Sequence, residues 1–314
     1  MQTQTKNPIF LVGCPRSGTT LLQQMLDAHP AVAIAPETFF IRRFWLQREY
    51  YGNLSQDMNY HQLIEDIIAI PEFKEMGLDA SNFREAAWSN PRDYPSVFCL
   101  LFEQFAHKRK VNIVGEKTPN HLLYMPILQE FFPSARFIHI IRDPRSVVKS
   151  WRKVPWSNGS LARDAEVWRR YMNTARLCPA SIKASLFNLY YEQLVTAPEE
   201  NLQALCHFLR LKYDPAMMNY HHKESGTINT IREPWKANAK NQISQASLGN
   251  WQTELSPRMV REIETVVWPE MKYLGYKVKT NRIHLLLAKG LIGAKHKLRL
   301  TFRRIKHRIS LQIK

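Results

Sequence analysis

The stretch IFLVGCPRSGTTLLQQML, residues 9–26, limits the fold more than any other part of the chain. Its first five residues are apolar and predict a buried strand, the segment from Gly13 to Gly18 predicts a tight loop, and the apolar spacing that follows predicts one face of a helix. A strand, a glycine-rich loop and a helix N-terminus together form a cradle of backbone N–H groups that binds anions. The stretch therefore predicts an α/β fold with an anion site at the end of a strand.

The rest of the chain extends this α/β pattern. Three further apolar runs predict buried strands, at residues 112–116, 136–141 and 186–191. Helical patterns lie between and after them, at residues 60–70, 97–106, 121–131, 144–153, 160–177, 198–209 and 256–267. Alternation of this kind predicts a P-loop-like parallel sheet flanked by helices. Residues 222–250, rich in Asn, Lys, Ser and Gln, predict a long loop of the kind that often carries function.

Positive charge is concentrated at the C-terminus. The chain of 314 residues has a formal net charge of +17, and the part from Met271 onward holds 13 Lys and Arg residues and no Asp or Glu. We therefore divide the chain into a domain at 1–280 and a basic C-terminal helical extension at 281–314. Apolar residues recur there at helical spacing, so residues 283–314 either contact an anionic membrane surface or pack on the domain. Nucleic acid is not an expected partner, because stacking aromatic residues are not interleaved with the charges.

Four cysteines without a CxxC pair predict neither a disulfide framework nor a metal site, and they suit a reducing compartment. The polar N-terminus MQTQTKNP does not resemble a signal peptide, and the sequence has no apolar run of about 18–20 residues that would span a membrane. We expect a cytoplasmic protein that contacts a membrane peripherally if the tail binds lipid. The sequence gives no indication of the oligomeric state.

The loop at 13–20 departs from a nucleotide-binding P-loop at one position. A P-loop requires Lys before its final Ser or Thr, and this chain has Thr19 there, followed by Thr20. Arg16 supplies a fixed positive charge three residues earlier, and Ser17, Gly18, Thr19 and Thr20 complete the predicted cradle. Loss of the lysine argues against a γ-phosphate ligand. The alternative is a plain strand-to-helix turn with a surface arginine.

A second candidate anion site lies in FIHIIRDPRSVVKSW, residues 137–151. Arg142 follows a predicted strand, Asp143 and Pro144 begin a helix, and Ser150 falls about two turns into it. Ligands of open α/β sheets bind at the carboxyl ends of the strands, so Arg142 and Ser150 are expected to face the same ligand as the loop. Two anion sites predict a ligand with phosphates at both ends. The alternatives are an ion pair of Arg142 with Asp143 and a surface hydroxyl at Ser150.

With both elements in view, the sequence resembles the PAPS-dependent sulfotransferases, whose donor is 3′-phosphoadenosine 5′-phosphosulfate (PAPS). PRSGTT at 15–20 is similar to the family's 5′-phosphosulfate loop, and RDPRSVVKS at 142–150 is similar to its 3′-phosphate element. The likeness extends over about residues 8–275 and is nearest to the Glu-using branch, which includes protein-tyrosine and bacterial carbohydrate sulfotransferases. It implies transfer of a sulfuryl group from PAPS to a hydroxyl, release of 3′,5′-ADP and no requirement for a metal.

The resemblance also implies roles for individual residues. Glu37, in APET, matches the position of the base, Lys117, in GEKTP, matches a lysine that stabilises the transition state, and Arg16 serves catalysis as well as binding. Tyr191 and Lys240 match donor-contacting positions. Each has a structural alternative: Glu37 as a cap, Lys117 as an ion-pair partner of Glu116, and Tyr191 as a core residue.

The acceptor is the least determined part of this reading. Phe39 and Phe40 stand where protein-tyrosine sulfotransferases carry arginine, which predicts a hydrophobic wall and disfavours an acidic peptide. We expect a hydroxyl of a carbohydrate, a lipid or a small molecule. Two alternative functions stay open: a P-loop-like kinase of a small substrate, and a non-catalytic basic membrane-associated binding protein.

Overall fold

The computed structural model describes residues 7–155, 157, 159–222, 233–281 and 284–285, and at positions 238 and 240 it describes the backbone alone. The chain forms two compact units. The first consists of residues 1–142 and 170–248, and the second of residues 143–169 and 249–314.

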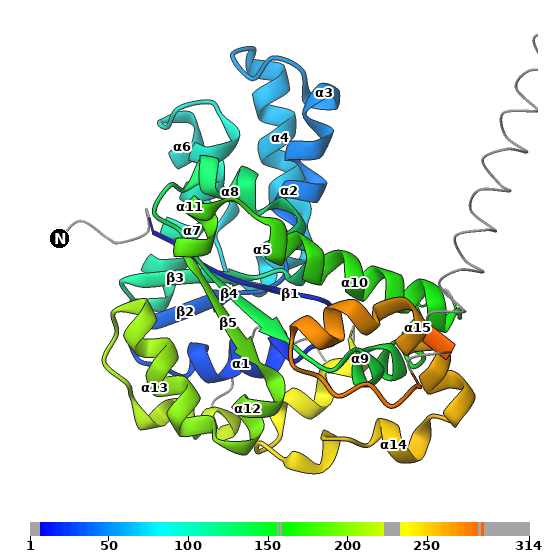
Figure 1. Ribbon diagram of the computed structural model, residues 1–314. Coiled ribbons are helices and arrows are strands. Elements are labelled where there is room, and N and C mark those ends of the chain that lie inside the picture. Colours follow the sequence, from blue (N-terminus) through cyan, green and yellow to red (C-terminus); the bar gives the residue numbers. More distant parts are fainter. Residues whose placement is uncertain (1–6, 156, 158, 223–232, 282–283, 286–314) are drawn as a thin grey trace, which may run out of the picture. The chain divides into compact units, whose positions relative to one another are not determined.

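The first unit contains a five-stranded sheet in which every neighbouring pair of strands is parallel (Figure 1). The strand order is β2-β3-β1-β4-β5. The bounds are Ile9–Gly13 for β1, Val32–Ala35 for β2, Ile113–Lys117 for β3, Arg136–Ile141 for β4 and Leu186–Tyr190 for β5. The predicted parallel sheet is confirmed, and four of its strands fall within one residue of the predicted bounds. The sequence analysis did not identify β2, which has only four residues.

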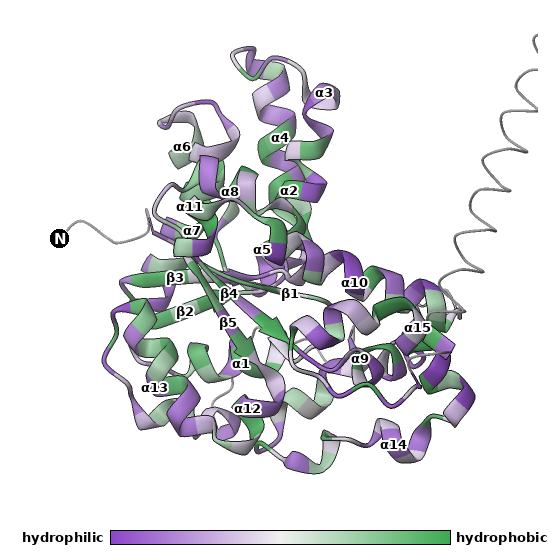
Figure 2. Ribbon diagram, viewed as in Figure 1, coloured by the Kyte–Doolittle hydropathy of each residue, from purple (hydrophilic) through white to green (hydrophobic). Residues whose placement is uncertain are grey.

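Side chains of β1 alternate between two apolar layers, which explains why this strand is buried along its whole length. Ile9 and Leu11 pack in a cluster with residues of three helices, α1 (Thr19–Asp27), α12 (Tyr191–Thr196) and α13 (Pro198–Leu209). Phe10 points the other way and contacts the rings of Phe98 and Phe102 in α7 (Tyr94–Arg109). Figure 2 shows the strands mainly in the hydrophobic colours and the helices with alternating colours.

A group of helices separates β2 from β3 in the sequence. Besides α7, they are α2 (Phe40–Arg43), η2 (Trp45–Gln47), α3 (Arg48–Tyr51), α4 (Asp57–Ala69), α5 (Pro71–Glu75) and α6 (Ala80–Trp88). Further helices of the first unit are η3 (Pro119–Tyr124), α8 (Met125–Phe131), α11 (Ala180–Ala184), η4 (Pro215–Met217) and η5 (Tyr220–His222). The described part of the predicted loop at 222–250 contains two short 3₁₀ helices, η6 (Pro234–Lys240) and η7 (Gln245–Ser247).

The second unit contains α9 (Pro144–Trp151), α14 (Trp251–Glu254), α15 (Pro257–Tyr273) and the beginning of α10 (Leu161–Leu177), which continues into the first unit. Arg145 of α9 organises it: its guanidinium donates to Asp143 and to Glu264, each over 2.7 Å, and lies 3.7 Å from the ring centroid of Trp251. Asp143 also caps α9 by accepting from the backbone N–H of Arg145. Its carboxylate is therefore engaged by Arg145.

Within the described ranges, no helix combines the length and the apolar character needed to cross a membrane. Of the predicted C-terminal helix at 283–314, only residues 284–285 are described. The boundary at 280, the helix and its membrane contact therefore stay predictions.

Candidate active site

The loop between β1 and α1 has the backbone geometry of an anion cradle. Arg16 adopts φ 72° and Gly18 adopts φ 103°, and turns that contain left-handed residues form anion-binding concavities of backbone N–H groups. Gly18 is the N-cap of α1 and provides no side-chain cap for the N–H groups of the first turn. The hydroxyl of Ser17 is buried and neither donates nor accepts a hydrogen bond within the described part of the chain. These groups fit a phosphate or sulfonate.

Gly18 is required here for a steric reason as well. A Cβ atom at this position would lie 2.4 Å from Cδ2 of Tyr191, at the start of α12. The ring of Tyr191 therefore closes over the loop, and its hydroxyl lies 2.7 Å from Oγ of Ser247. Tyr191 is 8% exposed and belongs to the apolar cluster of the first unit, so it is a core residue, and its contact with the donor stays a prediction.

Arg142 follows the end of β4 and contacts both Tyr191 and the loop between β1 and α1. Its guanidinium lies 4.0 Å from the ring centroid of Tyr191 and donates to the carbonyl of Arg16 over 3.2 Å. The Arg16 side chain in turn donates to the carbonyl of Trp235 over 3.0 Å. Burial and the neighbouring Arg142 lower the pKa of Arg16, but a guanidinium stays charged in proteins. Two fixed cations are thus held together where β1 and β4 end.

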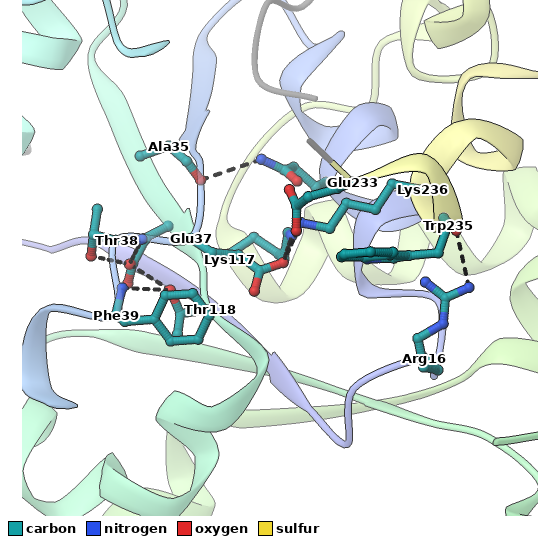
Figure 3. Close-up of polar contacts among 12 residues, drawn as sticks. Arg16, Ala35, Glu37, Thr38, Phe39, Lys117, Thr118, Glu233, Trp235 and Lys236 are labelled. Carbon is teal, nitrogen blue, oxygen red and sulfur yellow. Dashed lines mark hydrogen bonds and ion pairs between the residues drawn. The ribbon is translucent and has the colours of Figure 1, made fainter. Parts of the chain in front are cut away.

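Glu37 and Lys117 meet because their strands are neighbours. The short strand β2 pairs with β3 in the register Ala35↔Glu116, so the residues that follow Ala35 reach the end of β3. Lys117 Nζ donates to Oε1 of Glu37 (Figure 3). Glu37 comes to this edge of the sheet because it follows β2, the strand that was not predicted from the sequence.

Glu116 fixes the backbone beside Glu37. Its buried carboxylate accepts from the backbone N–H of Thr38 over 3.0 Å and from the hydroxyl of Thr118 over 2.6 Å. Burial alone would raise the pKa of Glu116, but His121 and these hydrogen bonds lower it. Glu116 is therefore not the ion-pair partner of Lys117 that the sequence left open. It positions the segment that carries the candidate base, a role that the sequence analysis did not assign.

Lys236 is a further site residue that the sequence analysis missed. It lies in η6, and its Nζ is 2.7 Å from Oε1 of Glu37 and 2.7 Å from Oε2 of Glu233 (Figure 3). The stretch EPWKANAK offers two lysines, Lys236 and Lys240, and no periodic pattern distinguishes them. Lys240, which was predicted to contact the donor, also belongs to η6, but its side chain lies outside the described part of the chain.

The two lysines tune the carboxylate between them. Burial would raise the pKa of Glu37, but Lys117 and Lys236 lower it to about 2. Burial lowers the pKa of Lys117 to about 8 against the opposing attraction of Glu37, and Lys236 adds repulsion. Burial also opposes the charge of Lys236, but Glu37 and Glu233 raise its pKa overall. Strongly shifted groups gathered in one place are typical of functional sites.

Two remaining expectations concern Phe40 and Ser150. Phe40 is fully buried and stacks on Phe98 with ring centroids 3.9 Å apart, so only the half-buried Phe39 is available for the predicted hydrophobic wall. Ser150 lies on α9, as predicted, in the second unit, and its contact with the donor stays a prediction. Among the described residues, no group of three or more His, Cys, Asp or Glu side chains is arranged to hold a metal.

Comparison with known proteins identifies the class of protein. The family model described as "Sulfotransferase family" matches residues 8–215. The chain belongs to this family and is an enzyme of sulfuryl transfer, which decides against the kinase alternative.

Particular relatives cover most of the chain. Protein-tyrosine sulfotransferase 1 of Danio rerio is 27% identical over 284 residues, which cover 87% of this chain and 73% of that protein. The human protein of the same name is 26% identical over 285 residues, which cover 87% of this chain and 70% of that protein. The sulfotransferase domain from the curacin biosynthetic pathway has a similar fold, with a TM-score of 0.60 and 21% identity over 87% of this chain and 98% of that one.

Proposed function

We propose that this sulfotransferase uses PAPS as its donor and transfers the sulfuryl group to a phenolic hydroxyl. The observation that carries the proposal is the contact of Lys117 with Glu37 beside a phosphate loop charged by Arg16. In this assignment the loop residues Ser17, Gly18, Thr19 and Thr20 bind the 5′-phosphosulfate. Arg142, Ser150 and Tyr191 bind the 3′-phosphate side of the nucleotide, together with Lys240.

The transfer forms one S–O bond and breaks another. The acceptor oxygen attacks sulfur, the bond between sulfur and the 5′-phosphate oxygen breaks, and its electron pair stays on that oxygen as 3′,5′-ADP leaves. Arg16 and the loop N–H groups stabilise the charge that develops there, and Lys117 neutralises the moving sulfuryl group. Preorganised donors of this kind contribute about 3–4 kcal/mol each to lowering the barrier.

Glu37 takes the proton of the acceptor hydroxyl. A base within reach of that proton typically contributes about 10²–10⁴-fold in rate. The flanking lysines keep the pKa of Glu37 at about 2, so it is a weak base while both of them contact it. A phenol, with a pKa of about 10, releases its proton to a weak base more readily than an aliphatic hydroxyl does.

The names of the relatives support the same acceptor class, since they are protein-tyrosine sulfotransferases. A phenol differs from the carbohydrate and lipid hydroxyls that we expected from the sequence, whereas a small-molecule acceptor, which we also expected, can be phenolic. The surroundings of Phe39 support a non-acidic context around the acceptor, because the Arg43 guanidinium, 5.3 Å from its ring centroid, is already paired with Glu72.

The donor is tested by ligand-dependent thermal stability. We expect 3′,5′-ADP to raise the melting temperature at concentrations where ATP with Mg²⁺ does not, because the cradle lacks the lysine that grips a γ-phosphate. Stabilisation by ATP with Mg²⁺ alone would overturn the donor assignment.

The acceptor is tested by offering labelled PAPS together with tyrosine peptides, phenols, glycans and lipid hydroxyls. Label on a non-phenolic acceptor alone would overturn the assignment of a phenolic acceptor.

A further inference from the structure

A single oxygen of Glu37 accepts from two lysines that come from different parts of the fold. Lys117 ends strand β3, whereas Lys236 lies in η6, outside the sheet. The Lys117 side chain is 2% exposed and the Lys236 side chain 9% exposed, so neither ion pair is a weak surface contact. Two buried cations therefore hold Glu37 as a carboxylate and weaken it as a base.

Glu37 becomes a stronger base when one of the two lysines moves away to another anion. Lys117 pairs with Glu37 alone among the described carboxylates, whereas Lys236 also pairs with Glu233 over 2.7 Å. Breaking a buried pair is costly when it leaves a charge without a partner. Lys236 keeps a carboxylate partner when it releases Glu37, so it is the lysine that can leave at lower cost.

The segment that carries Lys236 also borders the anion cradle. The carbonyl of the preceding residue, Trp235, accepts a hydrogen bond from the Arg16 side chain over 3.0 Å. Burial lowers the pKa of Arg16, and the charges of Glu37 and Glu233 act on Arg16 against that effect. Figure 3 displays Glu37, Lys236 and Arg16 in one close-up, linked through η6. An anionic group held by Arg16 next to Glu37 would therefore compete with Glu37 for the Lys236 ammonium.

We propose that Lys236 contacts the sulfuryl oxygens of the bound donor and thereby releases Glu37 to act as the base. The inference rests on the proposed function, since it requires a donor with a sulfonate at the cradle. Donor binding then strengthens the base by removing one of the two cations that hold it. The transfer step itself is unchanged: the proton of the acceptor goes to Glu37, and the leaving electron pair goes to the 5′-phosphate oxygen.

The test compares two nucleotides that differ by the sulfuryl group. Binding of PAPS and of 3′,5′-ADP is measured by calorimetry without acceptor, for the wild type and for Lys236→Met, Lys236→Arg and Lys212→Met. Loss of one charge-assisted hydrogen bond lowers affinity by about ten-fold or more. We expect Lys236→Met to weaken PAPS binding by that factor while 3′,5′-ADP binding stays within two- to three-fold. Lys236→Arg is expected to restore much of the loss, and Lys212→Met, at an exposed position, should change neither.

The other possible binding results separate failure of the Lys236 proposal from failure of the proposed function. Equal loss for both nucleotides, or no loss for either, would overturn the role of Lys236 while leaving PAPS as the donor. Failure of the wild type to bind either nucleotide would overturn the proposed function instead. If Lys236→Met does not fold, Glu233→Gln supplies the test: it removes the carboxylate partner that Lys236 keeps on leaving Glu37, so PAPS affinity should fall more than 3′,5′-ADP affinity. Unchanged affinity for PAPS, or an equal loss for both nucleotides, would contradict the proposal.

Discussion

Lys236 Nζ lies 2.7 Å from Oε1 of Glu37, although the two residues are 199 positions apart in the sequence. The contact connects the candidate base, which follows β2, with a 3₁₀ helix that follows all five strands. It leaves Glu37 with a carboxylate oxygen shared between two lysines. The charge balance around Glu37, rather than the position of the carboxylate alone, therefore sets how strong the base is.

Replacing the base should separate chemistry from binding. We expect Glu37→Gln to lower kcat by about 10²–10⁴-fold, because the amide cannot take the acceptor proton. Affinity for 3′,5′-ADP should not fall, since both flanking lysines remain and lose only a competing carboxylate. The measurement is kcat with labelled PAPS beside calorimetry with 3′,5′-ADP. A Glu37→Gln enzyme with the wild-type rate would show that another group is the base.

Arg16 should matter through geometry as well as charge. Arg16→Ala removes the fixed cation of the cradle and is expected to abolish measurable transfer, a loss of about 10²–10³-fold or more in kcat/KM. Arg16→Lys keeps the charge but not the planar fork that reaches the Trp235 carbonyl, so it should recover only part of the activity. Full activity in Arg16→Ala would remove Arg16 from the catalytic assignment.

Substitution of Gly18 should destabilise the protein more than substitution of Gly275, because only Gly18 lies against a neighbouring side chain. Gly18→Ala places a methyl group 2.4 Å from Tyr191 in a left-handed backbone, so we expect a loss of about 1–3 kcal/mol in the free energy of unfolding and weaker 3′,5′-ADP binding. Gly275 also has a left-handed backbone, with φ +80°, but a Cβ atom there would have no neighbour within 4 Å. Gly275→Ala should therefore lower the free energy of unfolding only by the conformational penalty of about 1 kcal/mol. Denaturant unfolding of both variants makes the comparison. Equal costs with unchanged nucleotide binding would contradict the steric role of Gly18.

Arg142 should recognise one end of the nucleotide. Arg142 stacks on Tyr191 and contacts the loop, and under the proposed assignment it binds the 3′-phosphate, so Arg142→Ala is expected to lower affinity for 3′,5′-ADP by about ten-fold or more. Affinity for 5′-AMP, which lacks that phosphate, should change little. Calorimetry with both nucleotides distinguishes this selective loss from a general collapse of the loop, which would weaken both equally.

The two pH limits of kcat/KM should move together in Lys236→Met. Glu37 must be ionised and faces Lys117, Lys236, Arg16 and Glu233; loss of one cation raises its pKa from about 2, so the acid-side fall begins at a higher pH. Lys117 must be protonated and loses a repelling neighbour, so its pKa rises from about 8 and the alkaline fall also moves up. A pH profile of the variant superimposable on the wild type would mean that Lys236 does not control these groups.

Much of this site was predictable because its parts have local signatures. The anion cradle consists of consecutive residues from Gly13 to Thr20, so the sequence shows it directly. The parallel sheet is predicted by apolar runs with helical patterns between them. The pairing of Glu37 with Lys117 depends on β2, whose four residues VAIA are too short for a distinct pattern. Lys236 depends on a contact across 199 positions within a polar segment, for which hydrophobic periodicity carries no signal.

Phe40 marks a different limit of the sequence. Two adjacent aromatic residues after Glu37 and Thr38 predicted a wall at the acceptor site, but the first of them adopts φ 53° and begins a short helix. That turn sends Phe40 into the core against Phe98 and leaves Phe39 half-buried. The direction of a side chain after a left-handed residue is set by the backbone, and the residue types alone do not reveal it.

The most direct test of sulfuryl transfer is to follow label from ³⁵S-PAPS into acceptors while 3′,5′-ADP is measured in the same reaction, with Glu37→Gln as the matched blank. Tyrosine peptides of neutral and acidic context, simple phenols and fractionated cell extracts form the acceptor panel. We predict label on a phenolic acceptor, an equal amount of 3′,5′-ADP, and loss of both in Glu37→Gln. A protein that binds 3′,5′-ADP yet transfers no label to any acceptor would contradict the assignment of the site to catalysis.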